Sequence, residues 1–255
     1  HNGSRGLGDV YKRQLLLSVR SGGKVSMPGM MDSVLNIGLN DSNVFQLAEA
    51  FNDERFALDS YRRLIQMYSN VVLGVEHERF EAVLANKKRM DNVVSDADFN
   101  VDQLNWIINA YKNTVERFTD SLFPQDPYEQ LTGAIEAVFN SWQNKRAVIY
   151  RKINNIPDSW GTGATIQTMV FGNLNDKSGT GVAFTRNPSN GDKELYGEYL
   201  INAQGEDVVA GIRTPHPIRK HSKIEQESLE SKFPKAYKEL LEISTKLENH
   251  FKEAQ

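Results

Sequence analysis

The stretch SVRSGGKVSMPGMMDSVLN, residues 18–36, places a single arginine between an apolar run and a loop rich in glycine and methionine. The apolar run at residues 15–19 predicts a short buried strand that delivers Arg20 to its end. Backbone amides at the glycines that follow can approach an anion, while the guanidinium offers a forked donor. Residues 27–31 would then form a mobile apolar lid. From these residues alone, a phosphate site and an ordinary loop with a surface arginine both remain open.

The composition is typical of a cytoplasmic globular protein of one or two domains. The chain has 255 residues, of which 39% are hydrophobic, and a net charge of −3. No window approaches the roughly 18 apolar residues that a membrane span needs, so we expect no membrane partner. The near-neutral charge predicts no nucleic-acid partner. Because the sequence contains no cysteine, disulfides and cysteine-based zinc sites are excluded.

The long middle of the chain, residues 42–154, is predicted to be helical. Its apolar residues recur at the spacing of one helix face. They are Phe56, Tyr61, Leu64, Ile65 and Tyr68 in an earlier helix, and Leu131, Ile135, Val138, Phe139 and Trp142 in a later one. Asp126 is a suitable cap for the later helix, with Pro127 at its first position.

Beyond residue 156 the pattern changes to alternating small, β-branched and aromatic residues between glycines, which indicates strands. We predict strands at residues 33–39, 164–172, 180–186, 195–203 and 207–212. The sequence NPSNGD between two of them is typical of a hairpin turn. Residues 225–251 return to a helical spacing. The predicted fold class is therefore α+β, with a helical half and a strand-rich half.

No catalytic residue and no metal ligand is predicted from the residues. Four histidines stand in polar or loop contexts without the spacing of ligands, and we interpret them as surface residues: His77, His216, His221 and His250. The two GTG triplets, residues 161–163 and 179–181, are interpreted as turns that lead into strands.

Five blocks of the sequence resemble the N-terminal nucleotide-binding part of the pyruvate, phosphate dikinase family. They are SVRSGGKVSMPGMMDSVLNIGLND, RFALDSYRRLIQMYSNVV, IQTMVFGN, SGTGVAFTRNPSNG and GEYLINAQGEDVVAGIRTPHPI, and the resemblance runs in order from residue 15 to residue 255. The related phosphoenolpyruvate synthases share the opening of the first block. They carry a different loop where this chain has SMPGMMD, which favours the dikinases.

The resemblance implies an ATP-grasp-like fold that holds Mg·ATP between two lobes. It assigns residues 15–41 and 126–163 to the first lobe, 42–125 to a helical subdomain and 164–255 to the second lobe. The family converts ATP, pyruvate and phosphate to AMP, phosphoenolpyruvate and diphosphate. The phosphoryl group passes to a histidine on a swivelling domain of the same parent chain. The resemblance further implies a homodimeric parent, located in the cytoplasm or in a plastid or other organelle.

The resemblance does not extend to residues 1–14, which we interpret as a non-native leader. A glycine-rich segment with a phosphate-binding lysine is expected before Leu15, and the Mg²⁺ ligands are expected beyond Gln255. We therefore expect both ends to be truncated. On this interpretation, the chain alone lacks transfer activity and binds ATP weakly or not at all.

The family's binding residues carry over onto matching positions. Arg20 would contact the ATP phosphates, and Gly29 and Ser33 fall in the loop that closes on them. The segment that borders adenine would comprise Gln167, Thr168, Met169 and Val170. The acids Glu198, Glu206 and Asp207 are interpreted as strand-edge or turn residues and not as Mg²⁺ ligands. The alternative is a non-catalytic nucleotide-binding or regulatory module of the same fold, or a phosphoenolpyruvate synthase.

Overall fold

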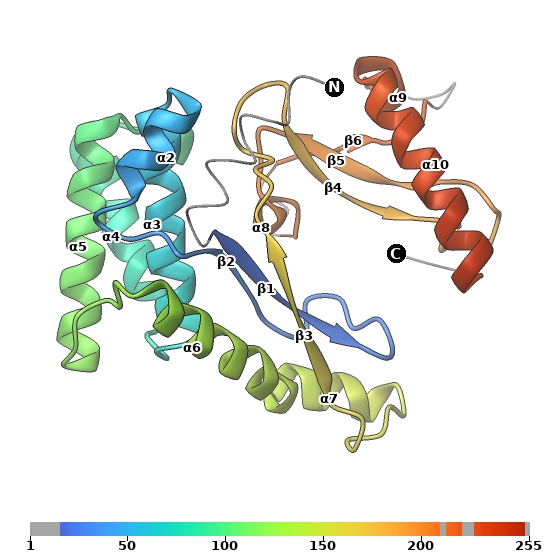
Figure 1. Ribbon diagram of the computed structural model, residues 1–255, viewed down its shortest axis with the longest axis horizontal. Coiled ribbons are helices and arrows are strands. Elements are labelled where there is room, and N and C mark those ends of the chain that lie inside the picture. Colours follow the sequence, from blue (N-terminus) through green and yellow to red (C-terminus); the bar gives the residue numbers. More distant parts are fainter. Residues whose placement is uncertain (1–15, 210–212, 221–226, 253–255) are drawn as a thin grey trace. The chain divides into compact units, whose positions relative to one another are not determined.

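The computed structural model describes residues 16–209, 213–220 and 227–252 (Figure 1). The chain divides into two compact units, with the boundary between Met169 and Val170. The sheets and helices of both units confirm the α+β class. The predicted leader, His221 and residues 210–212 of a predicted strand lie outside the described residues. Among the helices that are described, none has the length and apolar character needed to cross a bilayer.

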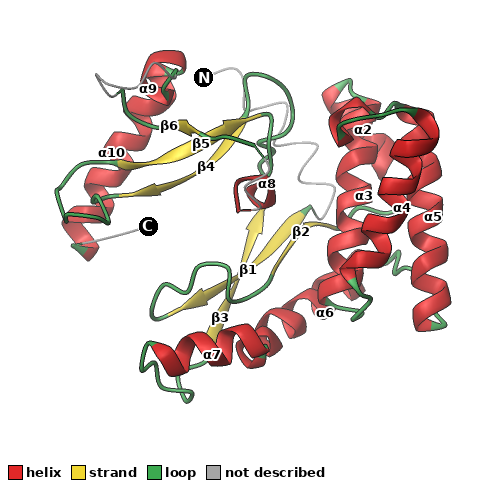
Figure 2. Ribbon diagram, turned by 180° about the vertical axis from the view of Figure 1, so that it is seen from behind, coloured by secondary structure: helices red, strands yellow, loops and turns green. Residues whose placement is uncertain are grey.

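The first unit is built on a three-stranded antiparallel sheet in the order β2-β1-β3. Its strands are β1 (Leu17–Gly23), β2 (Ser33–Ile37) and β3 (Thr162–Thr168). Helix α6 (Pro127–Asn140) contacts all three strands and lies along one side of the sheet (Figure 2). Val19, Val34 and Ile37 of the strands are fully buried. The core of this unit therefore lies under one face of the sheet, and the other face can carry polar side chains.

Two predicted strand boundaries in this unit are wrong. Strand β1 continues to Gly23 because β3 pairs with it along its whole length, so Arg20 stands in the middle of a strand and not at its end. The strand predicted at 164–172 begins at Thr162 and ends at Thr168. Since β3 pairs with β1, residues 164–169 belong to the first compact unit, which ends at Met169.

The helical prediction for residues 42–154 is confirmed. The helices are α2 (Val44–Phe51), α3 (Glu54–Val71), α4 (His77–Asp91), α5 (Val101–Thr119), α6 and α7 (Lys145–Ile153), with the short 3₁₀ helices η1 (Asp96–Asp98) and η2 (Ser141–Gln143). Helix α3 packs on α2, α5 and β2, and its predicted apolar residues are all buried. The prediction is less accurate in α6, where Phe139 is 49% exposed.

The start of α6 is confirmed in detail. The Asp126 carboxylate accepts the backbone N–H of Tyr128 at 2.8 Å, and Pro127 occupies the first helical position. A proline there loses no helical hydrogen bond, because the first N–H groups of a helix have no partner within it. This cap sets where α6 begins and so which of its residues reach the sheet.

The second unit contains an antiparallel sheet in the order β4-β5-β6. Its elements are β4 (Gly179–Phe184), β5 (Tyr196–Ile201), α8 (Gly205–Val209), β6 (His216–Pro217), α9 (Leu229–Lys232) and α10 (Pro234–Phe251). The predicted NPSNGD hairpin is confirmed. The Asn187 N–H donates to the Asp192 C=O at 2.9 Å, and the Gly191 N–H donates to the Asn187 C=O at 2.8 Å.

Three predictions in the strand-rich half are wrong. A helix, α8, stands where a strand was predicted at 207–212, because the Asp207 carboxylate accepts the Gln204 N–H at 2.7 Å and so favours a first helical turn. The single helix predicted at 225–251 is instead interrupted at Phe233, between α9 and α10, because Phe233 is not helical and proline favours the first position of a new helix. The second GTG triplet lies inside β4 and is not a turn.

A buried ion-pair network stabilises α3. The Asp59 carboxylate lies 2.8 Å from Arg62 Nη2 and 3.0 Å from Arg63 Nε. Burial by itself would raise the pKa of Asp59, but Arg62 and Arg63 outweigh it and lower this pKa to about 2. Because Arg62 is also buried, removing the carboxylate would leave its charge with only the more distant Asp96 carboxylate, 3.7 Å away, and with little access to water.

We expect Asp59→Asn to lower the free energy of unfolding by about 3–5 kcal/mol, because it breaks a buried ion pair. In the unmodified chain the folded pKa lies below the ordinary value of 3.8. The stabilisation is therefore fully present above that value and is lost as the pH falls towards 2. Urea unfolding over a pH series measures both effects. Glu76→Gln, which removes an exposed pair with Arg79, is the control and should change little. Equal losses in the two variants would contradict the prediction.

Candidate functional site

Arg20 lies on the face of the first sheet that is open to solvent. It stands directly opposite Ser33 of β2 and Thr165 of β3. Since alternate residues of a strand share a face, Ser18 of β1 and Gln167 of β3 lie on the same side. We call these five residues the polar sheet face. Arg20, Thr165 and Gln167 are exposed, whereas Ser18 is only 1% exposed.

The Arg20 guanidinium has a single hydrogen bond within the described part of the chain. Its Nε donates to Ser18 Oγ at 3.3 Å. No carboxylate of a described residue lies within ion-pair distance of it. An exposed guanidinium without such a partner retains donors in the fork geometry that matches a phosphate or a carboxylate. The arrangement can therefore bind an anion.

The loop between β1 and β2, residues 24–32, contains the predicted lid. Residues 27–30 form a β-turn, closed by the N–H of its last residue on the C=O of its first at 3.1 Å, and Gly29 has φ of +69°. A positive φ at the third turn position, after a proline, is typical of a type II turn, which favours glycine there. The structure differs from the predicted apolar lid because Met27 is buried and packs on Trp142. This methionine anchors the loop.

Polar contacts fix the far end of the same loop. Arg146 Nε donates to the Met30 C=O at 3.1 Å, and the Asp32 N–H donates to Ser141 Oγ at 3.1 Å. The Asp32 carboxylate accepts from Asn144 Nδ2 at 2.7 Å. Between the apolar anchor at Met27 and the polar anchor at Met30, Pro28 and Gly29 form the exposed tip of the turn.

Trp142, the residue under the loop, is itself locked in place. Its Nε1 donates to the Asp158 C=O at 3.0 Å, and the Arg151 guanidinium lies over its ring, 4.2 Å from the centroid. Arg151 is 1% exposed and donates through Nε to Asp158 Oδ1 at 2.8 Å. The sequence pattern does not predict this support. The helical spacing marked Trp142 as apolar core but carried no signal for its partners, which lie in α7 and the loop after it.

The four predicted adenine-border residues separate in the structure. Gln167 is exposed on the polar sheet face, whereas Thr168 lies on the opposite face by strand alternation. Met169 follows the strand and is 5% exposed. Val170 is 87% exposed and begins the second unit. One face therefore brings together three of the predicted residues, Arg20, Ser33 and Gln167, while Gly29 lies in the neighbouring loop.

In the described residues, no group of three or more histidine or acidic side chains could hold a metal ion. Glu198 lies in β5 opposite Val182, as expected for a strand residue. Glu206 and Asp207 lie in α8 and not in a turn.

The histidines differ in their surroundings. His77 is exposed, with its Nε2 3.4 Å from the Glu81 carboxylate, and His250 is also exposed. His216 is half-buried, and its Nδ1 is buried without a hydrogen-bond partner among the described residues. The His216 ring lies 5.6 Å from that of Tyr199.

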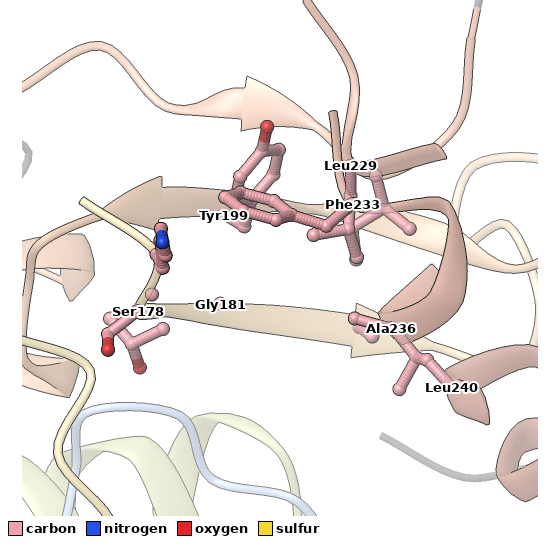
Figure 3. A pocket seen from close by; sticks show the side chains of 12 residues that line it. Ser178, Gly181, Tyr199, Leu229, Phe233, Ala236 and Leu240 are labelled. Atoms are coloured by element: carbon pink, nitrogen blue, oxygen red, sulfur yellow. The ribbon is translucent and has the colours of Figure 1, made fainter. Parts of the chain in front are cut away.

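A pocket of about 300 Å³ lies in the second unit, between the β4–β5 hairpin and helices α9 and α10 (Figure 3). Tyr199, Phe233 and Leu240 contribute apolar walls. At Gly181 a Cβ would lie 2.5 Å from the Glu198 C=O, so a larger residue would separate the strands. The Tyr199 hydroxyl is buried without a hydrogen-bond partner in the described part, and burial raises its pKa. The residues that line this pocket include none of the predicted site residues.

Residues 4–255 match the family model described as pyruvate phosphate dikinase, AMP/ATP-binding domain. The chain is 53% identical over 255 residues to the pyruvate, phosphate dikinase of Rhizobium meliloti strain 1021, covering 98% of this chain and 28% of that protein. It is 52% identical over 242 residues to that of Clostridium symbiosum, covering 94% and 27%. It is 52% identical over 247 residues to the chloroplastic protein of Mesembryanthemum crystallinum, covering 97% and 25%. The chain thus spans about a quarter of the length of these relatives.

We expect Gly29→Ala to lower the free energy of unfolding by about 1–2 kcal/mol, because an alanine is strained in the left-handed region. The strain is confined to the backbone, since no described atom lies within 4 Å of the added Cβ. Gly29→Asn should lower the free energy of unfolding by less, because asparagine adopts this conformation more readily than alanine. Chemical denaturation of the three chains measures the difference. Equal stability of the glycine and alanine chains would show that the turn does not require the positive φ.

Proposed function

Because the chain belongs to the pyruvate phosphate dikinase AMP/ATP-binding domain family, we propose that its first unit binds ATP through the polar sheet face. Arg20 is the main cation for the phosphates in this proposal. The observation that carries it is the exposure and charge of the Arg20 side chain. Its guanidinium is exposed in the middle of a sheet, and no carboxylate of a described residue neutralises it.

The groups around Arg20 suit phosphate oxygens. Ser33 and Thr165 flank the arginine from the two neighbouring strands, and each hydroxyl can donate a hydrogen bond to an oxygen. Gly29 leaves open space in the adjoining loop, so its backbone N–H can approach a phosphate closely. These donors add directional hydrogen bonds to the charge of one guanidinium.

Adenine would lie along the end of β3, at residues 167–170. Val170 is 87% exposed, and its backbone N–H and C=O make no hydrogen bond to any described residue. Its N–H and C=O are therefore available to the edge of a purine, which offers both donors and acceptors. Thr168 and Met169 would contribute through their backbone, since Thr168 lies on the other face and the Met169 side chain is buried.

For the whole enzyme, we propose that the nucleotide-binding part has an ATP-grasp-like fold and that the reaction converts ATP, pyruvate and phosphate to AMP, phosphoenolpyruvate and diphosphate. The histidine that accepts the phosphoryl group would lie on a domain outside this chain. Mg²⁺ would accompany ATP, held by phosphate oxygens and by protein ligands outside the described residues. For this chain alone we propose nucleotide binding without transfer.

Titration of the isotope-labelled chain with ATP, followed by amide correlation spectra, tests the proposal because it detects even weak binding. Saturable shifts are expected at Arg20, Ser33 and Gln167. Adenosine, which has no phosphates, should shift Gln167 but leave Arg20 almost unchanged. Shifts confined to the pocket of the second unit, or no saturable shifts at all, would contradict the proposed site.

We expect Arg20→Ala to weaken ATP binding about 10- to 100-fold, the range for losing hydrogen bonds to a charged group. Adenosine affinity should not change. The ATP affinity of Arg20→Lys should lie between those of the unmodified chain and of Arg20→Ala, because lysine keeps the charge but loses the forked pair of donors. Arg89→Ala, which removes an exposed arginine of α4, is the matched control. In a full-length enzyme that contains this segment, Arg20→Ala should abolish phosphoenolpyruvate formation, and unchanged formation would remove Arg20 from its assigned role.

A further inference from the structure

Ser18 joins Arg20 to the neighbouring strand β3. The Nε of Arg20 donates to Ser18 Oγ at 3.3 Å, and Ser18 Oγ donates to the C=O of Gln167 at 3.3 Å. The serine is 1% exposed, so water has little access to these bonds. Two hydrogen bonds thus connect three members of the polar sheet face, two from the start of the first unit in sequence and one from its end.

The chemistry of the three groups allows only one direction for this chain of bonds. A guanidinium has donors and no acceptor, and a carbonyl has acceptors and no donor. The Ser18 hydroxyl must therefore accept from Arg20 and donate to Gln167. An alanine at this position can do neither, whereas a threonine can do both.

The bond at Nε decides which edge of the guanidinium is left for a ligand. No other hydrogen bond to a described residue occupies Arg20, so its two terminal nitrogens, Nη1 and Nη2, are left. Together they can donate two parallel bonds to one phosphate. A long side chain loses rotamer freedom when it is fixed, and fixing it before the ligand arrives reduces the cost of binding.

The backbone at Ser18 is held from the other side by a β-bulge. The register between β1 and β2 shifts here, so that Leu35 and Asn36 together face Ser18. Asn36 has φ of +60°, and its Nδ2 donates to the Ser60 C=O of α3 at 3.1 Å. Bulges often re-aim side chains beside functional sites. Helix α3 therefore helps to define the place of Ser18.

From these contacts we propose that Ser18 is a positioning residue. It holds the Arg20 guanidinium by Nε, so that the terminal nitrogens are directed to the phosphates of ATP. The inference rests on the proposed function of the polar sheet face. It adds a residue that acts on the nucleotide only through Arg20, because its own hydroxyl is buried and both of its bonds are used within the sheet.

The first measurement needs no ligand. In side-chain correlation spectra of the whole chain, the Nε–H signal of Arg20, identified by its loss in Arg20→Ala, reports the bond and the fast mobility of the side chain. Ser18→Ala should shift this signal and lower its order parameter, and Ser18→Thr should restore both. Ser69→Ala is the matched control, because it removes another buried hydroxyl, one in α3 that has no hydrogen-bond partner among the described residues.

The second measurement is nucleotide affinity, taken from the same amide titration. Ser18→Ala should weaken ATP binding about tenfold, the effect of one hydrogen bond of ordinary strength, and leave adenosine binding unchanged. Ser18→Thr should bind ATP as the unmodified chain does. In an Arg20→Ala background the serine change should have no further effect, since a double-mutant cycle isolates the coupling between the two residues.

The outcomes separate this inference from the proposed function. Unchanged ATP affinity in Ser18→Ala, where Arg20→Ala weakens binding, would overturn the positioning role and leave the phosphate site standing. A loss that persists in the Arg20→Ala background would overturn it too, because Ser18 would then support the sheet in general. If Arg20→Ala itself has no effect, the proposed function fails and the inference falls with it. If Ser18→Ala does not fold, an Arg20 order parameter in the unmodified chain as low as that of exposed Arg89 would overturn the inference.

Discussion

Strands β1 and β3 pair residue by residue, from Leu17 opposite Thr168 to Gly23 opposite Thr162. The whole helical region lies between them in sequence, so closing this ladder costs chain entropy that grows only slowly with the length enclosed. Ladder hydrogen bonds and the burial of the sheet against α6 offset that cost. Once the ladder is closed, strand alternation determines which residues of β3 lie on the same face as Arg20. The boundary after Met169, the place of Thr165 and Gln167 beside Arg20, and the bond from Ser18 to Gln167 all follow from this one register.

The loop beside this face combines order and freedom in a way that suits a phosphate site. Its base is fixed because Met27 packs on Trp142, which is held in turn by Arg151 and Asp158. Methionine fills such an irregular gap well because its side chain is unbranched and flexible. Only the tip of the turn, Pro28 and Gly29, is exposed beyond these anchors. A ligand that orders only a short turn loses less of its binding energy to conformational entropy than one that must order the whole loop.

Several features could be predicted because their cause is local. The spacing of apolar residues in α3, the cap at Asp126 and the NPSNGD hairpin depend on neighbours within a few positions, and the structure confirms them. The failures have non-local or competing causes. Arg20 lies in mid-strand because β3 extends the ladder past it. Residues 205–209 form a helix because a side-chain cap at Asp207 outweighs the apolar pattern that favoured a strand. Trp142 under Met27 is held by Arg151 of α7 and by Asp158 of the following loop, and no spacing of residues in the sequence predicts these contacts.

The sequence by itself determined the α+β class, the helices of the middle region and the family to which the chain belongs, because periodicity, capping residues and long characteristic blocks are properties of contiguous residues. It also singled out Arg20 as an unusual cation beside glycines. Only the tertiary structure decided that Arg20, Ser33 and Gln167 share one face, that Thr168 does not, and that Ser18 bonds the arginine from within the sheet. The reason is the two-residue period of a strand. A register shifted by one position would turn the same residues to opposite faces, and register is set by pairing between segments far apart in the chain.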